Sequence, residues 1–222
     1  MKKHITIILI LFTILGYSQD SKTKELLISG NNAFQKNDFE NARKHYSEII
    51  KIDSINKDAI FNLAITELNL GNKNKSCELL QKSYKLQDSG VAKLIKEHCG
   101  EIEYNENMFY QDTDEMPKFK IDNNVYDLIT DKGINPILFE KLSARAKKSK
   151  VLRRIKGRKI FVIFKIDKDG NFDSRTTGKN TSKEIDNEIK EIFREITEYI
   201  PCQYQNKDVG MWNGFALPIN LK

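Results

Sequence analysis

The sequence has few of the residues on which enzyme chemistry usually depends. It contains three histidines, three cysteines, four prolines and one tryptophan among 222 residues. His4, His45 and His98 stand at spacings that match no pair of metal ligands, either with each other or with a cysteine. No serine or cysteine nucleophile motif and no glycine-rich phosphate loop occurs. We therefore expect a protein without catalysis, metal or cofactor.

Long hydrophobic runs are also scarce, and the one present lies at the N-terminus. Lys2 and Lys3 precede an almost unbroken apolar run from Ile5 to Leu15, and Gly16 and Ser18 place small residues before a cut at residue 19. This arrangement is typical of a secretory signal peptide at residues 1–18. A membrane anchor is the alternative, but a span needs about 20 apolar residues. No cysteine follows the run, so we see no site for a lipid anchor there.

Cleavage of this segment removes two lysines and lowers the formal net charge from +6 to +4. A charge of that size requires neither nucleic acid nor an anionic membrane as a partner. We expect a periplasmic protein of a Gram-negative-type cell, with no transmembrane span after cleavage. Because export separates the protein from nucleic acid, we expect no nucleic-acid ligand.

Two segments in the first half of the chain align at a shift of 34 residues. Small residues fall at matching positions, where two helices approach closely, and bulkier residues one turn along fill the space between helices. A turn falls where left-handed backbone is easiest. The aligned pairs are Gly30 with Ala64, Asn37 with Gly71, Ala42 with Ser76, Tyr46 with Leu80, and Ile49 with Ser83.

This pattern resembles the tetratricopeptide repeat, a helix–turn–helix of the same period, with repeats at 23–56 and 57–90. The consensus tryptophan is absent, and Ser54 and Asp88 stand where proline is usual. An apolar helix at 91–99 is typical of a cap on such a solenoid, which gives a helical domain at 19–100. The resemblance implies a concave groove lined by the first helices. Plain structural packing is the alternative to partner binding by the groove candidates Asn31, Phe34, Asn62 and Glu67.

The cysteines follow from export, because an oxidising compartment favours disulfides and an odd number leaves one cysteine over. Cys77 would begin the second helix of the last repeat and Cys99 would end the cap helix, so antiparallel packing brings them together. We predict a Cys77–Cys99 disulfide that stabilises the domain by about 3 kcal/mol. Two buried free thiols are the alternative. Cys202 would be a spare thiol, since no histidine lies in its half of the chain to activate it.

The second half of the chain changes pattern. Residues 101–120 are acidic without a helical stripe, and we predict a linker there with a short strand near Met108–Tyr110. A second domain at 121–222 follows, with a helix at 136–150, strands at 156–167 and 171–177, an amphipathic helix at 183–200 and a long last strand within 208–222. Pro218 cannot donate to a ladder, so the last strand is expected to have a free edge near its end. The predicted fold class is thus α+β in two domains, with helical hairpins first and then a small antiparallel sheet with an amphipathic helix.

Oxygen-bearing side chains alternate at Asp167, Asp169, Asn171 and Asp173, which raises the question of a calcium loop. Counted from Asp167, position 6 is a phenylalanine where glycine is required, and position 12 is a glycine where a bidentate glutamate is required. The stretch DKDGN between two apolar strands instead favours a hairpin turn.

The hairpin IDKDG, the helix after it and the final stretch IPCQYQNKDVGMWNGFALPINLK together resemble the TonB C-terminal domain over about 115–222. The usual glycine is missing from Asn206-Lys207-Asp208, and Leu221 replaces the usual phenylalanine, so the match concerns the fold more than TonB activity. The resemblance implies a sheet that adds an extended segment of an outer-membrane protein as a further strand. Its candidate partner-binding residues are Met211, Trp212, Phe215 and Leu217, with Trp212 expected to be exposed. The elements that carry the resemblance are Phe164–Gly170, Ile185–Tyr199, Pro201, Gln205–Val209 and Leu217–Leu221.

Acidic residues are absent from 141–159, where ten lysines and arginines gather. A solvated helix face and loop is one interpretation. A contact for an acidic partner or for anionic polymers of the envelope is the other. The residues of this predicted basic patch are Lys147, Lys148, Lys150, Arg153 and Arg154.

The expected function is a non-catalytic periplasmic module for protein–protein interaction, in which a helical groove and a sheet edge each take a partner. A TonB-type energy transducer, or a component that supports outer-membrane transport, is one alternative. It requires a membrane anchor and a long proline-rich spacer, and four prolines in the whole chain argue against it. A cell-wall polymer binder that uses the basic run is the other alternative.

Overall fold

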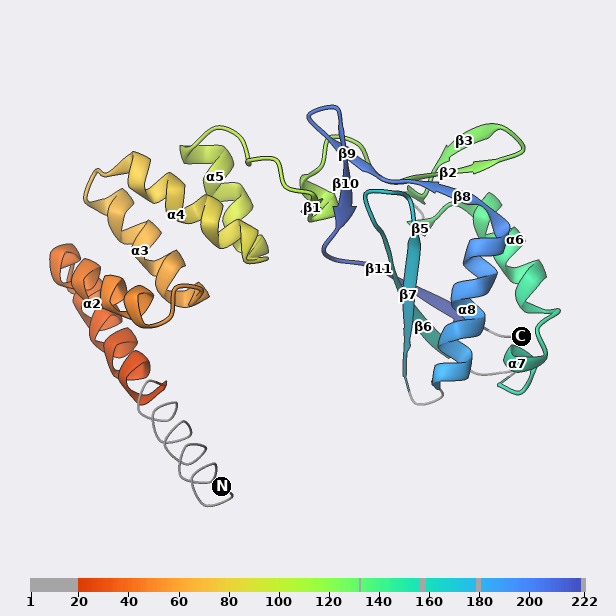
Figure 1. Ribbon diagram of the computed structural model, residues 1–222, viewed down its shortest axis with the longest axis horizontal. Helices are drawn as coiled ribbons and strands as arrows, with labels where there is room; N and C mark the ends of the chain where they lie inside the picture. The colour runs from red at the N-terminus through yellow and green to blue at the C-terminus, as the bar shows by residue number, and fades with distance from the viewer. Residues whose placement is uncertain (1–19, 132, 156–158, 179–180, 221–222) are drawn as a thin grey trace, which may run out of the picture. The chain divides into compact units, whose positions relative to one another are not determined.

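The structure, a computed structural model, describes residues 20–131, 133–155, 159–178 and 181–220 (Figure 1). The predicted signal peptide at 1–18 lies outside these residues. The chain divides into two compact units, Met1–Glu103 and Tyr104–Lys222, which we call the helical unit and the sheet unit. The mixture of helices with small, mainly antiparallel sheets confirms the α+β class.

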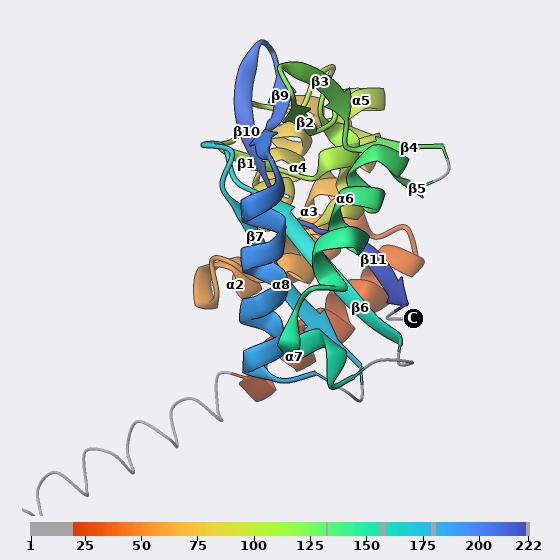
Figure 2. The ribbon, with the colours of Figure 1, turned by 90° about the vertical axis from the view of Figure 1, so that its right-hand side faces the viewer.

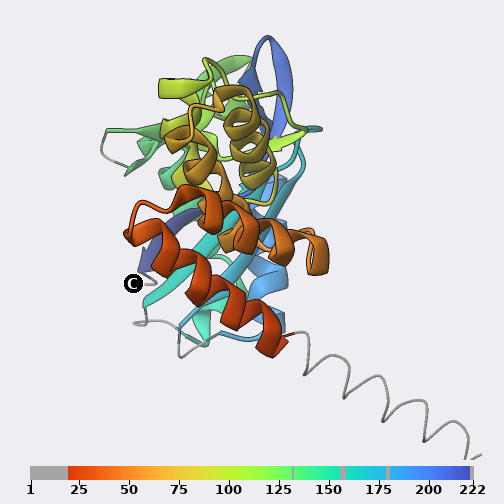
Figure 3. The ribbon, with the colours of Figure 1, turned by 90° about the vertical axis from the view of Figure 1, so that its left-hand side faces the viewer.

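The helical unit is a series of helices that pack against their neighbours in chain order (Figure 3). A helix at 20–35 comes first. It is followed by α2 (Phe39–Ile52), α3 (Lys57–Asn69), α4 (Lys73–Lys85), the short 3-10 helix η1 (Ser89–Val91) and α5 (Ala92–His98).

Local sequence signals set the ends of these helices. Asn37 and Gly71 adopt left-handed backbone, with φ of +60° and +80°, as the repeat alignment predicts. The Asp38 carboxylate accepts a hydrogen bond from the backbone N–H of Asn41 and so caps α2. Asn56 caps α3 in the same way. Each turn therefore has the residue type that its backbone requires.

The aligned small residues lie where the helices approach most closely. Ala42, Ala64 and Ser76 are fully buried. A Cβ on Gly30 would lie 2.6 Å from the ring of Tyr46, so only glycine lets that ring lie against the helix at 20–35. The 34-residue period therefore corresponds to real packing positions.

The predicted disulfide is confirmed: Cys77 and Cys99 are bonded, with their Cα atoms 5.6 Å apart. The chain then leaves α5 along α4. There the side-chain amide of Gln81 donates to the Glu101 carbonyl at 2.8 Å and accepts from the Glu103 N–H at 3.1 Å. Disulfide and amide together fix the end of the helical unit to α4.

The described strands of the sheet unit form four small sheets. All their strand pairs are antiparallel except β1 with β10, which is parallel. In order across each sheet they are β1 (Asn107–Met108), β10 (Lys207–Met211) and β9 (Cys202–Tyr204); β3 (Asn124–Asp127), β2 (Lys118–Ile121) and β8 (Glu198–Ile200); β11 (Phe215–Asn220), β6 (Lys159–Ile166) and β7 (Phe172–Thr177); and the hairpin β4 (Ile129–Thr130) with β5 (Gly133–Ile134). A 3-10 helix, η2 (Tyr110–Asp112), follows β1.

The core of this unit lies between the β11–β6–β7 sheet and the helices α6 (Pro136–Ala146) and α8 (Lys183–Ile196) (Figure 2). Alternate residues of β6 and the apolar stripe of α8 are buried against each other. Phe172 stacks on Phe193 with ring centroids 4.5 Å apart, and Phe164 lies 5.7 Å from Phe193. Each such buried side chain contributes about 1.5–3 kcal/mol. The buried set is Ile160, Val162, Phe164 and Ile166 from β6 with Ile185, Ile189, Ile192 and Phe193 from α8.

The segment expected to be a linker, 101–120, differs from that expectation. Met108 is fully buried in β1, and this strand pairs in parallel with β10. Lys118 begins β2. The short strand predicted near Met108–Tyr110 is present as Asn107–Met108, whereas sequence reasoning missed β2 at the end of the segment.

Two predicted helices are shorter than expected. The helix expected at 183–200 ends at Ile196, because Glu198–Ile200 pair with β2 and Pro201 disfavours helical backbone at the residue before it. The helix expected at 136–150 ends at Ala146. Ser149 then takes extended backbone, and its hydroxyl caps the short helix α7 (Lys150–Arg153) by accepting from the Leu152 N–H.

The long last strand is in fact two strands in different sheets, β10 and β11. The break spans Trp212 to Gly214, and a Cβ on Gly214 would lie 2.5 Å from the Phe164 carbonyl oxygen. Glycine is needed where the chain passes that close to β6. Alternation continues on both sides of the break, so the pattern alone could not reveal it.

Within the described ranges, no helix combines the length and the apolar character that crossing a membrane requires.

Candidate binding surfaces

The helical unit has a cavity of about 260 Å³ between the helix at 20–35, α2 and α3. Three of the four predicted groove residues, Asn31, Phe34 and Asn62, line it. Sequence reasoning missed the other lining residues, which are the sequence neighbours of Phe34 and Asn62, a residue one turn after Asn62, and a tyrosine of α2. They are Gln35, Tyr46, Phe61 and Ile65.

A chain of close contacts holds the polar side of this cavity. Because Gly30 has no side chain, the buried Tyr46 ring reaches across, and its hydroxyl donates to Asn31 Oδ1 at 2.7 Å. Asn62 Nδ2 donates to the same oxygen at 3.2 Å. Burial raises the pKa of Tyr46, so this hydroxyl stays protonated at neutral pH. The carboxamides of Asn31 and Asn62 are thus oriented, and the amide nitrogen of Asn31 and the amide oxygen of Asn62 remain for a ligand.

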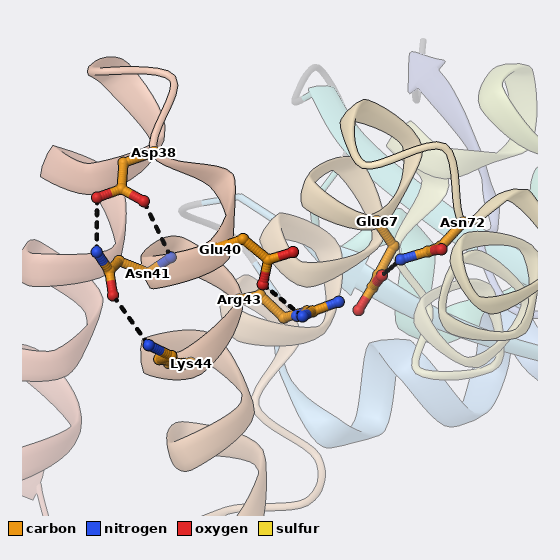
Figure 4. A network of polar contacts seen from close by, with 7 residues as sticks. All are labelled: Asp38, Glu40, Asn41, Arg43, Lys44, Glu67 and Asn72. Atoms are coloured by element: carbon orange, nitrogen blue, oxygen red, sulfur yellow. Dashed lines mark hydrogen bonds and ion pairs between the residues drawn. The ribbon is translucent and has the colours of Figure 1, made fainter.

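The structure does not bring the fourth predicted groove residue, Glu67, to the cavity lining. Glu67 is 6% exposed, and its carboxylate accepts from Asn72 Nδ2 at 2.7 Å (Figure 4). Asn72 precedes α4, so this contact ties the start of α4 to α3. The same view shows polar pairs along α2, where Asp38 contacts Asn41 and Glu40 contacts Arg43.

A larger cavity of about 460 Å³ lies beside β11 in the sheet unit. None of the described residues that line it is charged. Phe215 and Leu217, two of the predicted partner-binding residues, form part of its wall. The described lining residues are Ile129, Gly133, Ile134, Pro136, Phe139, Phe164, Phe215, Ala216, Leu217 and Pro218.

The two edges of the β11–β6–β7 sheet differ in how their outward groups are satisfied. On β7, the Thr176 N–H donates to Asp186 Oδ1 at 2.6 Å, and Arg194 Nε donates to the Phe172 carbonyl at 3.3 Å. Both partners are side chains of α8. Helix α8 therefore covers the β7 edge with hydrogen bonds.

On β11, no described strand pairs with the outer edge. Pro218 lies opposite Phe161 and has no N–H to give β6, so position 218 belongs to the set whose backbone groups point outward. Because backbone N–H and C=O groups alternate in direction along a strand, those of Ala216 also point away from β6. The outer edge of β11 therefore presents the Ala216 N–H and the carbonyls of Ala216 and Pro218 beside the apolar cavity.

The structure places Met211 and Trp212, the remaining predicted partner residues, away from this edge. Met211 is 4% exposed in β10. Trp212 is half-buried and packs edge-on against Phe109 with ring centroids 5.2 Å apart. The ring of Phe215 is also partly covered, since the ring of Tyr110 packs against it with centroids 4.1 Å apart.

Several cations of the basic run are paired with acids. Arg145 Nε lies 2.7 Å from Glu195, Arg154 lies 2.9 Å from Glu184, and Lys141 lies 3.7 Å from Asp122. Lys147, Lys148, Lys150 and Arg153 are exposed, and no carboxylate of the described residues pairs with them. Lys156 and Arg158 lie outside the described residues.

Cys202 is the free cysteine of the described residues. Cys202 is fully buried, and burial raises the pKa of its thiol to about 11, so it is protonated at neutral pH. Among the described residues, no group of three histidine, cysteine or acidic side chains is placed to hold a metal ion.

The Asp167 hairpin has the turn that its sequence predicts. Asp167 Oδ1 accepts from the N–H groups of Asp169 and Asn171 at 2.9 and 2.8 Å, and Gly170 has a φ of +80°. Burial acts to raise the pKa of Asp167, but these hydrogen bonds together outweigh it and lower the pKa. The Asp167 oxygens therefore serve the turn.

No protein-family model matches the chain, and no solved structure matches it.

Proposed function

We propose that the chain is a non-catalytic interaction module of the cell envelope, in which the helical unit and the sheet unit each bind a partner protein. The helical unit would act as a tetratricopeptide-like groove and the sheet unit as a TonB C-terminal-like domain. The observation that carries the proposal is the unpaired outer edge of β11 next to an apolar cavity.

The contrast between the two sheet edges supports a specific role for β11. An uncovered edge invites uncontrolled pairing, and proteins usually cover such edges or interrupt them. Here α8 covers β7 through Asp186 and Arg194, while β11 has only Pro218 to limit pairing. Pairing is therefore restricted to the first half of β11, which is the part that borders the cavity.

The cavity beside β11 supports a partner of defined chemistry. An extended segment that pairs with Ala216 directs alternate side chains to one face. One of these would enter the cavity, whose uncharged lining favours a large apolar side chain. Backbone hydrogen bonds would give affinity, and the cavity would give selectivity.

The helical cavity suits a second peptide contact. The amide nitrogen of Asn31 and the amide oxygen of Asn62 offer one donor and one acceptor, which match the C=O and N–H groups of an extended chain. Asn62 is held in the cavity wall by Asn31, and the neighbouring Phe34 and Phe61 supply an apolar floor. The Cys77–Cys99 disulfide supports the envelope as the location, since disulfides persist in oxidising compartments.

The test uses two substitutions with opposite effects on β11. Ala216→Pro removes the outward N–H, whereas Pro218→Ala adds one, and both positions point away from β6. Fluorescence anisotropy would measure binding to a panel of synthetic ten-residue peptides that carry apolar residues at alternate positions. Loss of one hydrogen bond that leaves a carbonyl unpaired costs about 1–3 kcal/mol, which is about a fivefold to 150-fold change in dissociation constant.

We expect peptides with a large apolar side chain to bind, with affinity lowered by Ala216→Pro and raised by Pro218→Ala. Circular dichroism would show that both variants keep the wild-type helix content. If both variants bound the same peptides with wild-type affinity, or no peptide bound the wild type, strand addition at β11 would be rejected. Because Pro218→Ala predicts a gain, a fold defect in Ala216→Pro cannot imitate the full result.

A further inference from the structure

Four unpaired cations lie on consecutive turns where α6 passes into α7. Lys147 and Lys148 follow the last turn of α6, and Lys150 and Arg153 belong to α7. All four are exposed, and we call them the α6–α7 cation cluster. Two acids of α8 are engaged with neighbouring arginines, since Glu184 pairs with Arg154 and Glu195 with Arg145. The cluster therefore presents positive charge that no described carboxylate neutralises.

The exposed side of α6 leads directly into this cluster. Ile137, Lys141 and Ala144 recur at spacings of four and three residues, which places them on one side of the helix, and Lys148 continues the row into the turn. Ile137 is 39% exposed although it is a large apolar residue. The opposite side of α6 is buried through Leu138 and Leu142. Ile137 and Lys148 therefore lie in one row along the exposed side, and the other cations of the cluster lie close to Lys148 in the sequence.

We propose that this side of the sheet unit binds the surface of a membrane that contains anionic phospholipids, a role separate from the strand addition proposed above. The cations would attract lipid phosphates, and Arg153 would contribute its guanidinium Nη groups, since only its Nε is engaged, with the Ser149 carbonyl at 3.3 Å. Ile137 would enter the boundary between headgroups and acyl chains. A soluble polyanion would use the cations but would gain nothing from Ile137, and this difference favours a lipid surface.

The modest net charge of the whole chain does not by itself produce binding to an anionic membrane, because the attraction between a cation and lipid phosphates falls off within a Debye length of about 8–10 Å. What matters is the local density of cations. Each lysine or arginine near an anionic surface strengthens binding about fivefold, so four together give a partition coefficient several hundredfold larger than without them.

The test measures co-sedimentation of the full chain with vesicles of mixed phosphatidylglycerol and phosphatidylcholine. Vesicles of phosphatidylcholine alone give a baseline, which also subtracts any binding through the apolar run at 5–15. The cluster variant replaces Lys147, Lys148, Lys150 and Arg153 with glutamine. A charge-matched control replaces Lys36, Lys51, Lys57 and Lys73 of the helical unit with glutamine, because these are exposed lysines with the same total charge.

We expect the wild type and the charge-matched control to bind anionic vesicles alike, with binding that weakens as salt rises. The cluster variant should bind several hundredfold more weakly, and Ile137→Ser should bind about threefold to tenfold more weakly. Equal loss in the charge-matched control would show that net charge alone acts, and would overturn the proposal. So would unchanged vesicle binding by the cluster variant. Binding to soluble polyphosphate together with full vesicle binding by Ile137→Ser would assign the cluster to polyanions and also overturn it.

Discussion

Removal of the Cys77–Cys99 disulfide should destabilise the helical unit and leave the sheet unit unchanged. The bond joins residues 22 apart in the sequence, and for a loop of that length the chain-entropy relation gives about 3 kcal/mol at 25 °C. A unit of this size is stable by about 4–12 kcal/mol in total. The disulfide therefore accounts for a large share of the stability of two short hairpins and a cap.

Two optical signals separate the units during urea unfolding. The sole tryptophan of the sequence, Trp212, lies in the sheet unit, so its fluorescence reports on that unit. Far-ultraviolet circular dichroism is dominated by the helical unit, which holds most of the helical residues. With a urea dependence of about 1–1.5 kcal/mol per molar for a unit of this size, we expect reduction to lower the dichroism midpoint by about 2–3 M. The fluorescence midpoint should stay where it is.

The double variant Cys77→Ala with Cys99→Ala serves as the control, since it should reproduce the reduced protein and show no response to reductant. A fall of less than 1 kcal/mol in the dichroism transition would refute the loop argument. An equal fall in both transitions would refute the assignment of the disulfide to one independently stabilised unit.

Two further predictions concern single residues. Gly30→Ala should lower the free energy of unfolding of the helical unit by about 1–2 kcal/mol in urea titrations, because the new Cβ displaces the Tyr46 ring and this overpacking exceeds the gain in helix propensity. Ser29→Ala, on the exposed side of the same helix, should not destabilise the unit. Equal behaviour of the two variants would contradict the close packing. Asp167→Ala should cost about 1–2 kcal/mol through the lost hydrogen bonds of the turn. Because folding lowers the pKa of Asp167 below its usual 3.8, the ionised carboxylate stabilises the fold above that pH, and the stabilisation disappears as the pH falls through the folded value. The difference between wild type and variant should therefore shrink in acid, and a difference that grows in acid would reverse the assigned sign.

The features that sequence reasoning predicted well are those that a repeated or local pattern encodes. The 34-residue shift located the buried small residues and the left-handed turns at Asn37 and Gly71. The mismatch at Phe172 and Gly178 correctly separated a hairpin from a calcium loop. Placing two cysteines at the ends of neighbouring helices was enough to predict their bond. In each case the physical requirement applies within one helix hairpin or one turn.

The features that it missed depend on partners far away in the chain. Strand β2 begins at Lys118, at the end of the expected linker, and pairs with β8, about 80 positions later. The break at Gly214 follows from the close approach of β6 and not from any change in alternation. The cavity beside β11 combines residues of β4, β5 and α6 with β11, and only the fold brings these together. Glu67 looked like a groove residue by its place in the repeat, but its bond to Asn72 turns it inward.

The sheet edge open to a partner is decided by the polar side of α8 as much as by β11 itself. The apolar stripe of α8 fixes the helix on the sheet, and this places Asp186 and Arg194 within hydrogen-bond distance of β7. Both side chains belong to the helix face that a sequence reading treats as solvated. Since they satisfy the outward groups of β7, an incoming strand would have to break two existing hydrogen bonds there and none at Ala216 of β11. The preference for β11 therefore follows from a difference in hydrogen-bond occupancy between two edges of the same sheet.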